Sequence, residues 1–155
     1  MAGKGTPAIV AAERAGIPFT VHEYAHDPRA ASYGVEAAEK LGLDPAHVFK
    51  TLVADVDGTL MVAVVPVAAQ HDLRALGKRA TLADPRLAER TTGYVAGGIS
   101  PLGQRKQLPT VVDESALGFE TVHVSAGRRG LELELAPADL IELTGGRTLR
   151  IAAQR

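Results

Sequence analysis

Short apolar runs, separated by glycine, proline and aspartate, divide this sequence into stretches of predicted strand and helix. Runs rich in β-branched and other apolar residues predict strands, whereas a capping residue or proline before a run and a glycine after it predict helices. The predicted strands cover residues 17–24, 48–55, 59–65, 110–113, 121–125, 131–135 and 148–152. The predicted helices cover residues 8–15, 32–41, 72–77, 85–90 and 137–143.

The order of these elements predicts the fold class. Asp57-Gly58 lies between two β-rich runs and is a strong hairpin signal, so at least one antiparallel strand pair is expected. Strands and helices do not alternate strictly, as they would in a parallel βαβ fold. We therefore expect one α+β domain over residues 1–155, built around a mixed sheet that can close on itself.

The amino-acid composition limits the classes of protein to which this chain can belong. The chain has 155 residues, of which 46% are hydrophobic, and this is enough apolar material for a core. No apolar run reaches the length of a membrane span and the first residues lack a signal-peptide pattern, so we expect a cytoplasmic protein without membrane contact. The absence of cysteine excludes disulfides, thiolate metal sites and a cysteine nucleophile.

The charges of the chain nearly cancel. Seventeen lysine and arginine residues stand against eighteen aspartate and glutamate residues, which gives a formal net charge of −1. A protein that binds nucleic acid unaided normally carries a basic face, because phosphate neutralisation supplies most of the non-specific affinity. The balance therefore predicts that a nucleic-acid substrate would be held weakly or delivered by a partner.

A long loop without regular periodicity lies in the middle of the chain. Residues 97–109 contain three glycines, two prolines and the basic pair Arg105-Lys106, which excludes a helix or a central strand. Ordered segments are predicted on both sides, so a binding loop is favoured over a disordered linker. Glycines let backbone N–H groups approach a ligand and form an anion-binding concavity. A solvated loop, with the basic pair on its rim, is the alternative.

Lys50 stands out by its position in a predicted strand. Strand alternation puts it on the same face as Val48 and Leu52, and the opposite face is apolar as well. A buried ammonium group is costly unless anionic or hydrogen-bonding partners surround it. A functional lysine and a lysine that snorkels at a strand end are both open interpretations.

The sequence gives weaker signals for a metal site, a catalytic triad or aromatic binding residues. The five histidines form no Glu-x-x-His or His-x-x-x-His helix, so neither a metal site nor another cofactor is expected. Ser100 lies in no nucleophile-elbow context, and no Ser-His-Asp triad can be defined. Tyr24 and Tyr33 bracket the connection between a predicted strand and a predicted helix. They are candidates for stacking or hydroxyl contacts, or else core aromatic residues.

Four motifs, in this order, resemble the YbaK/EbsC family, which comprises free-standing relatives of the editing domain of bacterial prolyl-tRNA synthetases. The motifs are Phe49-Lys50-Thr51-Leu52, Thr91-Thr92-Gly93-Tyr94, Gly97-Gly98-Ile99-Ser100-Pro101-Leu102-Gly103 and Val124-Ser125-Ala126-Gly127-Arg128-Arg129-Gly130-Leu131. The likeness spans almost the whole chain and looks closest to the YbaK branch, the Cys-tRNA(Pro) deacylases. It implies a mixed, mostly antiparallel, barrel-like sheet flanked by helices, and trans-editing hydrolysis of misacylated tRNA as the activity.

The resemblance also implies which residues form the site. The essential lysine of the family falls on Lys50, which is the catalytic candidate, and its Gly-x-x-Pro loop falls on residues 98–101. The implied substrate-binding residues are Tyr24, Tyr33, Thr51, Gly97, Gly98, Ile99, Ser100, Pro101, Ser125 and Glu132.

From these residues we form a hypothesis for the reaction. Lys50 binds the terminal phosphate or the ester region and stabilises developing charge, while residues 98–101 hold the 3′ aminoacyl end. The thiol of the substrate cysteine attacks its own ester and leaves as a thiolactone, which suits a chain without cysteine. The near-neutral charge then predicts that tRNA(Pro) is recognised by a partner, prolyl-tRNA synthetase, in a transient complex.

Two alternatives belong beside this hypothesis. One is a deacylase for Ala-tRNA(Pro) or another small aminoacyl-tRNA that uses water, since the same lysine and loop occur in several branches. The other is a non-catalytic module that binds the synthetase or the tRNA 3′ end.

Overall fold

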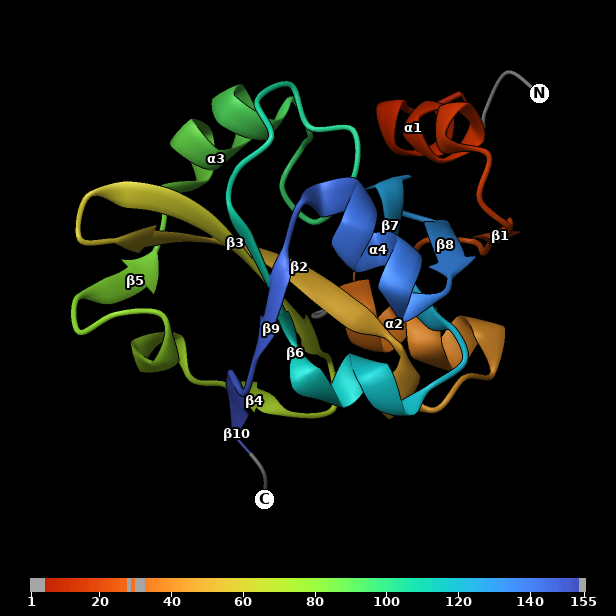
Figure 1. Cartoon of the computed structure of the whole chain (residues 1–155). Helices are drawn as coiled ribbons and strands as arrows, with labels where there is room; N and C mark the ends of the chain where they lie inside the picture. The colour runs from red at the N-terminus through yellow and green to blue at the C-terminus, as the bar shows by residue number, and fades with distance from the viewer. Residues whose placement is uncertain (1–4, 28, 30–32, 154–155) are drawn as a thin grey trace.

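Figure 1 shows the computed structural model of the chain, which describes residues 5–27, 29 and 33–153. The α-helices are α1 (Pro7–Ala15), α2 (Tyr33–Leu41), α3 (Pro85–Thr92) and α4 (Pro137–Thr144). The strands are β1 (Phe19–Glu23), β2 (Phe49–Val56), β3 (Thr59–Pro66), β4 (Gln70–His71), β5 (Ala80–Leu82), β6 (Thr110–Asp113), β7 (Val122–Arg128), β8 (Leu131–Leu135), β9 (Arg147–Leu149) and β10 (Ala152–Ala153). Short 3-10 helices cover η2 (Pro45–His47), η3 (Leu73–Ala75) and η4 (Glu114–Gly118). Within these described ranges, no helix is long and apolar enough to cross a membrane.

Two main sheets carry the fold. The five-stranded sheet has the order β5-β2-β3-β6-β9 and is mixed, because β2 pairs antiparallel with β5 and β3 whereas β6 pairs parallel with β3 and β9. The three-stranded sheet has the order β1-β8-β7 and is antiparallel throughout. A parallel bridge between Val48 and His123 joins the two sheets. A further antiparallel pair, β4 and β10, lies near the C-terminal end (Figure 1).

The predicted hairpin forms where its turn residues require it. β2 and β3 pair along their whole length, and the turn between them places both Asp57 and Gly58 at positive φ, 53° and 87°. Two consecutive residues at positive φ match the twist of antiparallel strands, and Asp-Gly is a favoured pair for this turn. The turn thus sets the register of the strand that carries Lys50.

The predicted α+β class with a mixed, mostly antiparallel sheet is confirmed. The strands at 110–113 and 131–135 have the predicted bounds. The predicted strand at 148–152 was wrong as one element, because the chain leaves the sheet after Leu149. The carboxylate of Asp113 accepts the N–H groups of Ile151 and Ala152, each at 2.9 Å, in place of ladder bonds. The predicted helix at 72–77 is only the 3-10 turn η3.

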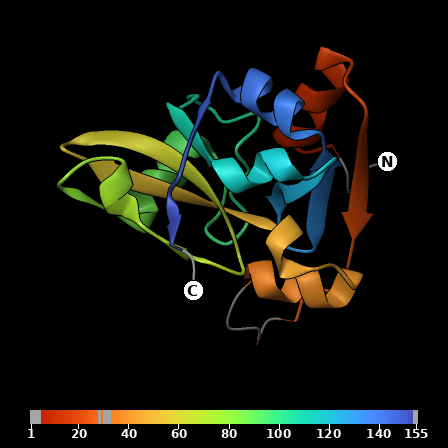
Figure 2. The same ribbon diagram turned by 60° about the horizontal axis from the view of Figure 1, so that its bottom comes forward.

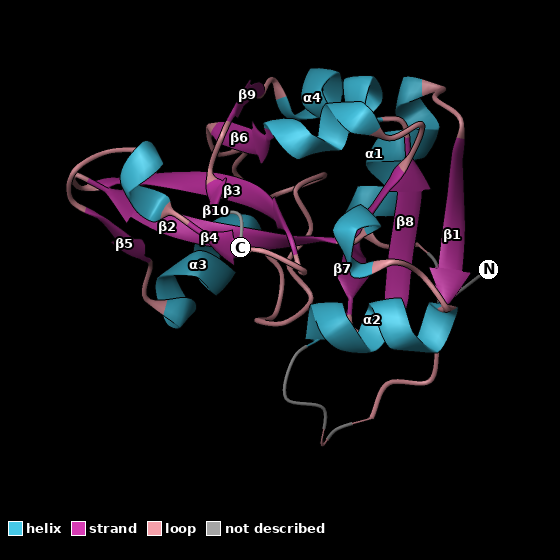
Figure 3. Ribbon diagram, turned by 90° about the horizontal axis from the view of Figure 1, so that it is seen from below, coloured by secondary structure: helices cyan, strands magenta, loops and turns pink. Residues whose placement is uncertain are grey.

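The helices pack at two ends of the sheets. Ala8, Ile9 and Ala12 on α1 and Leu140 on α4 join the main apolar core with residues of both sheets. Figures 2 and 3 show α1 and α4 together at one end and α2 across the opposite end of β1, β8 and β7. Ala37 and Ala38 of α2 form a second buried cluster with Val48, and α2 therefore packs beside the start of β2.

Candidate active site

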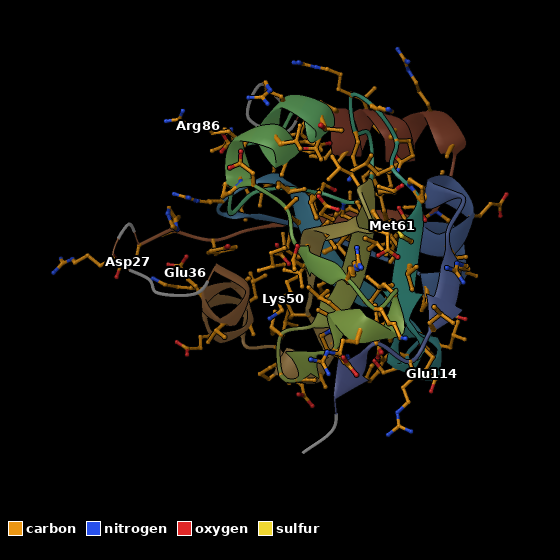
Figure 4. The ribbon with its side chains drawn as sticks, turned by 90° about the vertical axis from the view of Figure 1, so that its left-hand side faces the viewer. Asp27, Glu36, Lys50, Met61, Arg86 and Glu114 are labelled. Carbon is orange, nitrogen blue, oxygen red and sulfur yellow. The ribbon has the colours of Figure 1, made fainter. Side chains whose placement is uncertain are left out.

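Lys50 lies in the half of β2 that β5 leaves uncovered. Its partner on β3 is Val65, whereas β5 pairs only with residues 54–56. β5 therefore covers only the second half of this strand. The Lys50 side chain is half-buried and makes no hydrogen bond or ion pair with the rest of the described chain. In Figure 4 it lies on the same side of the molecule as Glu36 of α2.

Strand register brings three predicted site residues onto one sheet face. Residues opposite one another on neighbouring strands project from the same face. The parallel bridge pairs Val48 with His123, Lys50 and Ser125 each lie two residues beyond this bridge, and β2 and β7 are in contact. Ser125 is in turn paired with Glu132 of β8. A lysine, a serine and a glutamate from three strands thus form one row.

Ser125 links this row to the glycine-rich loop (residues 97–109). Its hydroxyl donates to the carbonyl oxygen of Gly98 at 3.1 Å and accepts the N–H of Gly127 at 3.1 Å. The strand register shifts between Ser125 and Arg128, and Gly127 there has a φ of +111°. This β-bulge fits the general role of bulges in directing side chains at functional sites.

The glycine-rich loop approaches the backbone of the β7–β8 turn too closely for a larger residue. A Cβ built on Gly98 would lie 2.8 Å from the Cα of Arg128 and 3.2 Å from the backbone N of Arg129. Real Cβ atoms essentially never come within 3.0 Å of another heavy atom, so this contact requires glycine. The guanidinium of Arg129 donates to the carbonyl oxygen of Ala96 at 2.9 Å and holds the preceding turn.

Inside the loop, side chains predicted to meet a ligand are used for packing. Ser100 is fully buried and its hydroxyl accepts the N–H of Leu102 at 3.2 Å, while Pro101 is buried beside it. The Tyr94 hydroxyl donates to the Leu102 carbonyl at 2.6 Å. Gln104 donates to the Ser100 carbonyl at 3.1 Å. Hydrogen bonds among its own residues and to Tyr94 thus hold the loop as a fixed platform.

Two backbone donors of the platform have no use within the described structure. The Gly98 N–H is bonded to the Val95 carbonyl at 2.9 Å. No hydrogen bond among the residues of known placement uses the N–H groups of Ile99 and Ser100. Because Ser100 is fully buried, the Ile99 N–H is the one of the two that can meet a ligand, and a free N–H of this kind can stabilise an anion or an oxyanion.

Glu132 is a buried carboxyl group in this row. It is 6% exposed, and burial raises its pKa to about 8. The protonated and ionised forms are therefore both populated near neutral to mildly alkaline pH. A carboxyl group of this kind can take and return a proton, which is the property that general acid–base chemistry needs.

The remaining predicted site residues, Tyr24, Tyr33 and Thr51, lie in different places relative to the row of Lys50, Ser125 and Glu132. Tyr24 packs against the second cluster, and burial raises its pKa with added effects of the Glu132 and Glu36 charges. Tyr33 begins α2, but its side chain lies outside the described part of the structure. Strand alternation puts Thr51 on the face opposite Lys50, where its hydroxyl is buried without a hydrogen-bond partner in the described structure.

The structure adds a polar network that the sequence reading missed. His22 Nε2 lies 2.8 Å from Glu134 Oε1, Thr121 donates to Glu134 Oε2 at 2.6 Å, and His123 Nε2 is 4.0 Å from the same oxygen. These residues face the same way as the Lys50 row. The ligand atoms of His22, His123 and Glu134 lie within 4.8 Å of one another, but both Glu134 oxygens already accept hydrogen bonds. Only strand pairing reveals the network, because its members are far apart in sequence.

A second missed interaction orders the segment after β1. Glu36 of α2 is buried, and its carboxylate meets His26 Nδ1 at 2.8 Å and accepts the Asp27 N–H at 2.6 Å. Burial alone would raise the pKa of Glu36, but these hydrogen bonds lower it below its ordinary value. The ionised carboxylate thus ties the chain beside Tyr24 to α2.

Comparisons with protein families and with other proteins show what this chain resembles. Residues 27–143 match the family described as "Aminoacyl-tRNA editing domain". An Enterococcus faecalis protein named "Putative Cys-tRNA(Pro)/Cys-tRNA(Cys) deacylase EbsC" is 36% identical over 155 positions, covering 96% of this chain and 94% of that protein. The Bacillus subtilis protein YwhH, described as uncharacterized, is 25% identical over 114 positions, covering 70% and 73% of the two chains.

Two solved structures share the arrangement of the whole chain. One is described as "Crystal structure of a putative trans-editing enzyme for prolyl tRNA synthetase"; it has a TM-score of 0.83, 25% identity and coverage of 96% of both chains. The other, "hypothetical protein APE2540", has a TM-score of 0.84 at 24% identity, covers 96% of this chain and all of its own, and is a likeness of fold.

Proposed function

Because this chain belongs to the aminoacyl-tRNA editing domain family, we propose that it removes cysteine from Cys-tRNA(Pro) in trans, with its whole length acting as one editing domain. The observation that carries this proposal is the row of Lys50, Ser125 and Glu132 beneath the glycine-rich loop. Deacylation of aminoacyl-tRNA is the activity of the family. The choice of cysteine and of tRNA(Pro) draws support from the Enterococcus faecalis relative and its name.

The proposed reaction uses the substrate's own thiol. The cysteine sulfur attacks the ester carbonyl, a C–S bond forms, the C–O bond to the ribose 3′ oxygen breaks, and a thiolactone leaves. The thiol proton must reach the departing 3′ oxygen. Glu132 accepts it and returns it, because its pKa of about 8 lies near the working pH.

Lys50 and the loop backbone supply the positive electrostatic environment. Charge develops on the carbonyl oxygen as the thiol attacks, and preorganised donors directed at that oxygen lower the barrier. Lys50 has no partner among the described side chains, so its ammonium group is available to the ester or the terminal phosphate. The N–H group of Ile99 is a second donor in this proposal.

A separate, cysteine-specific editing protein compensates for the limited selectivity of the synthetase pocket. A binding pocket separates small side chains of similar volume poorly, so a second site must remove the error. In this proposal the enzyme acts in the cytoplasm, and prolyl-tRNA synthetase passes the mischarged tRNA to it in a transient complex.

Single-turnover deacylation tests the proposal. Cys-tRNA(Pro), Cys-tRNA(Cys), Ala-tRNA(Pro) and Ser-tRNA(Pro) are each mixed with excess wild type, Lys50→Ala and Lys50→Arg. We expect cysteinyl ester to be lost selectively with release of thiolactone, and Lys50→Ala to slow this by roughly 100-fold or more. Faster loss of the alanyl ester would instead indicate a water-using deacylase. Turnover of no ester would indicate a binding module.

A further inference from the structure

Three arginines line one short segment that leads into the glycine-rich loop. A Cβ built on Gly93 would lie 3.4 Å from the Cβ of Arg105, so the Arg105 side chain begins beside this position. Arg129 donates to the carbonyl of Ala96, and the backbone of Arg128 touches Gly98. Residues 93–98 therefore run between basic side chains from two distant parts of the chain.

The end of α3 adds two more cations. The N–H of Arg105 donates to the Thr92 carbonyl at 2.8 Å, and the N–H of Lys106 donates to the Thr91 carbonyl at 3.1 Å. This pairing joins Lys106 to the end of α3, where Arg90 precedes Thr91. We call the set the basic rim; it consists of Arg90, Arg105, Lys106, Arg128 and Arg129, all of them exposed.

Positive charge is in strong excess at the basic rim. Glu89 is an acidic neighbour, and its carboxylate already accepts the Ala96 N–H at 2.7 Å. Among the described ion pairs, none involves Arg90, Arg105, Lys106 or Arg128. A chain with a net charge of −1 thus gathers five of its seventeen basic residues beside one loop.

We propose that the basic rim binds the phosphodiester backbone of the tRNA acceptor end, a step that rests on the proposed function. The Lys50 row takes the terminal aminoacyl nucleotide, so the phosphates before it pass the adjoining segment 93–98. Cations at a phosphate backbone release counterions and make binding dependent on salt. Val95, within this segment, is 71% exposed and offers an apolar surface to an unpaired base. The near-neutral net charge therefore does not mean that the isolated protein lacks a surface for tRNA.

Binding of an uncharged acceptor-stem minihelix of tRNA(Pro), followed by fluorescence anisotropy at several salt concentrations, tests the rim. The variant Arg105→Gln/Lys106→Gln/Arg128→Gln removes three charges and spares Arg129, whose side chain supports the loop. The control variant Arg74→Gln/Lys78→Gln/Arg79→Gln removes three exposed charges near η3.

The expected result is a selective loss in the rim variant. The slope of log K against log salt should fall in magnitude by about two to three, and the affinity at low salt by at least about tenfold. The control variant should keep the wild-type slope. Equal slopes for both variants, or no measurable binding by wild type at low salt, would overturn the proposal.

A short substrate separates this proposal from the deacylase proposal. The rim variant should deacylate the cysteinyl ester of a CCA trinucleotide at a near wild-type rate but lose activity on a charged minihelix. Lys50→Ala should lose activity on both and still bind the minihelix. If no form of the protein deacylates either substrate but minihelix binding still depends on the basic rim, the deacylase proposal is refuted. The proposal that the rim binds the tRNA backbone is then supported. An equal loss on both substrates in the rim variant would contradict the rim.

Discussion

Ser125 donates a hydrogen bond to the carbonyl oxygen of Gly98 at 3.1 Å, across 27 residues of sequence. This bond attaches the glycine-rich loop to the strand that lies beside Lys50. The same hydroxyl accepts the N–H of Gly127 and so fixes the bulge in β7. One side chain therefore sets the distance between the loop backbone and the row that carries the chemistry.

Replacing Ser125 by alanine should impair deacylation more than folding. The change leaves the Gly98 carbonyl and the Gly127 N–H without their partner, which costs about 0.5–1.5 kcal/mol per lost hydrogen bond. Misplacing the loop should lower the single-turnover rate by about 10- to 100-fold. Ser125→Thr keeps the hydroxyl and serves as the matched control. A rate equal to wild type in Ser125→Ala would contradict the positioning role.

Gly98→Ala should displace the loop. The added methyl would lie 2.8 Å from the Cα of Arg128, and backbone cannot move aside as a flexible side chain can. We expect a loss of about 1–3 kcal/mol in unfolding free energy together with a large fall in deacylation rate. Gly118→Ala is the control, because a Cβ there meets nothing within 4 Å. Urea unfolding and single-turnover rates measure both effects, and a fully active Gly98→Ala would refute the close contact.

Glu132 should make stability fall as the pH rises. Burial raises its pKa to about 8 in the folded state, above the value of about 4.3 expected in the unfolded chain. Its stabilising contribution is therefore complete below about pH 4.3 and is lost progressively as the pH rises through about 8. Glu132→Gln should remove this dependence and be relatively more stable at pH 8–9. Urea unfolding of both proteins between pH 5 and pH 9 measures the difference, and parallel pH profiles would contradict it.

The same substitution should change the pH dependence of catalysis. If Glu132 transfers the thiol proton, Glu132→Gln should lower the rate and abolish the inflection near pH 8. A rate profile with its inflection unchanged in the variant would assign that inflection to another group, such as the substrate thiol.

Tyr94→Phe should destabilise the protein through the loop. The Tyr94 ring is buried, and its hydroxyl donates to the Leu102 carbonyl at 2.6 Å. Burial raises its pKa to about 12, so the hydroxyl stays a donor over the working pH range. Removing it leaves a buried carbonyl unsatisfied, at a cost of about 1–3 kcal/mol. Thermal unfolding should show a lower Tm, and an unchanged Tm would mean that water replaces the hydroxyl.

Local sequence signals were sufficient for most elements. The Thr6 cap with Pro7 and Gly16 bounds α1, and Asp57-Gly58 makes the hairpin. Such signals act through φ/ψ preferences and hydrogen bonds within a few residues, so a single sequence reveals them. Short strands such as β4 and β5 went unpredicted, because two or three residues carry too little periodicity and exist only through their partners.

Chemistry-bearing residues could be named from the motifs, but not the way in which they meet. Lys50 and the glycine-rich loop were visible as an unusual lysine and an unusual loop. Lys50 and the loop come close in space through the Val48–His123 bridge between the two sheets and through the hydrogen bond from Ser125 to Gly98. Both connect positions that are dozens of residues apart, and no local pattern encodes such pairing.

The order of elements, the hairpin register and the family membership follow from residue types and their spacing, since these depend on short-range preferences and on motifs. Three properties arise only when the chain is folded: the burial that raises the pKa of Glu132, the packing that buries the Ser100 side chain, and the gathering of the basic rim. Burial and electrostatic potential are sums over neighbours in space. A net charge of −1 cannot reveal a cationic surface that forms from three separate segments.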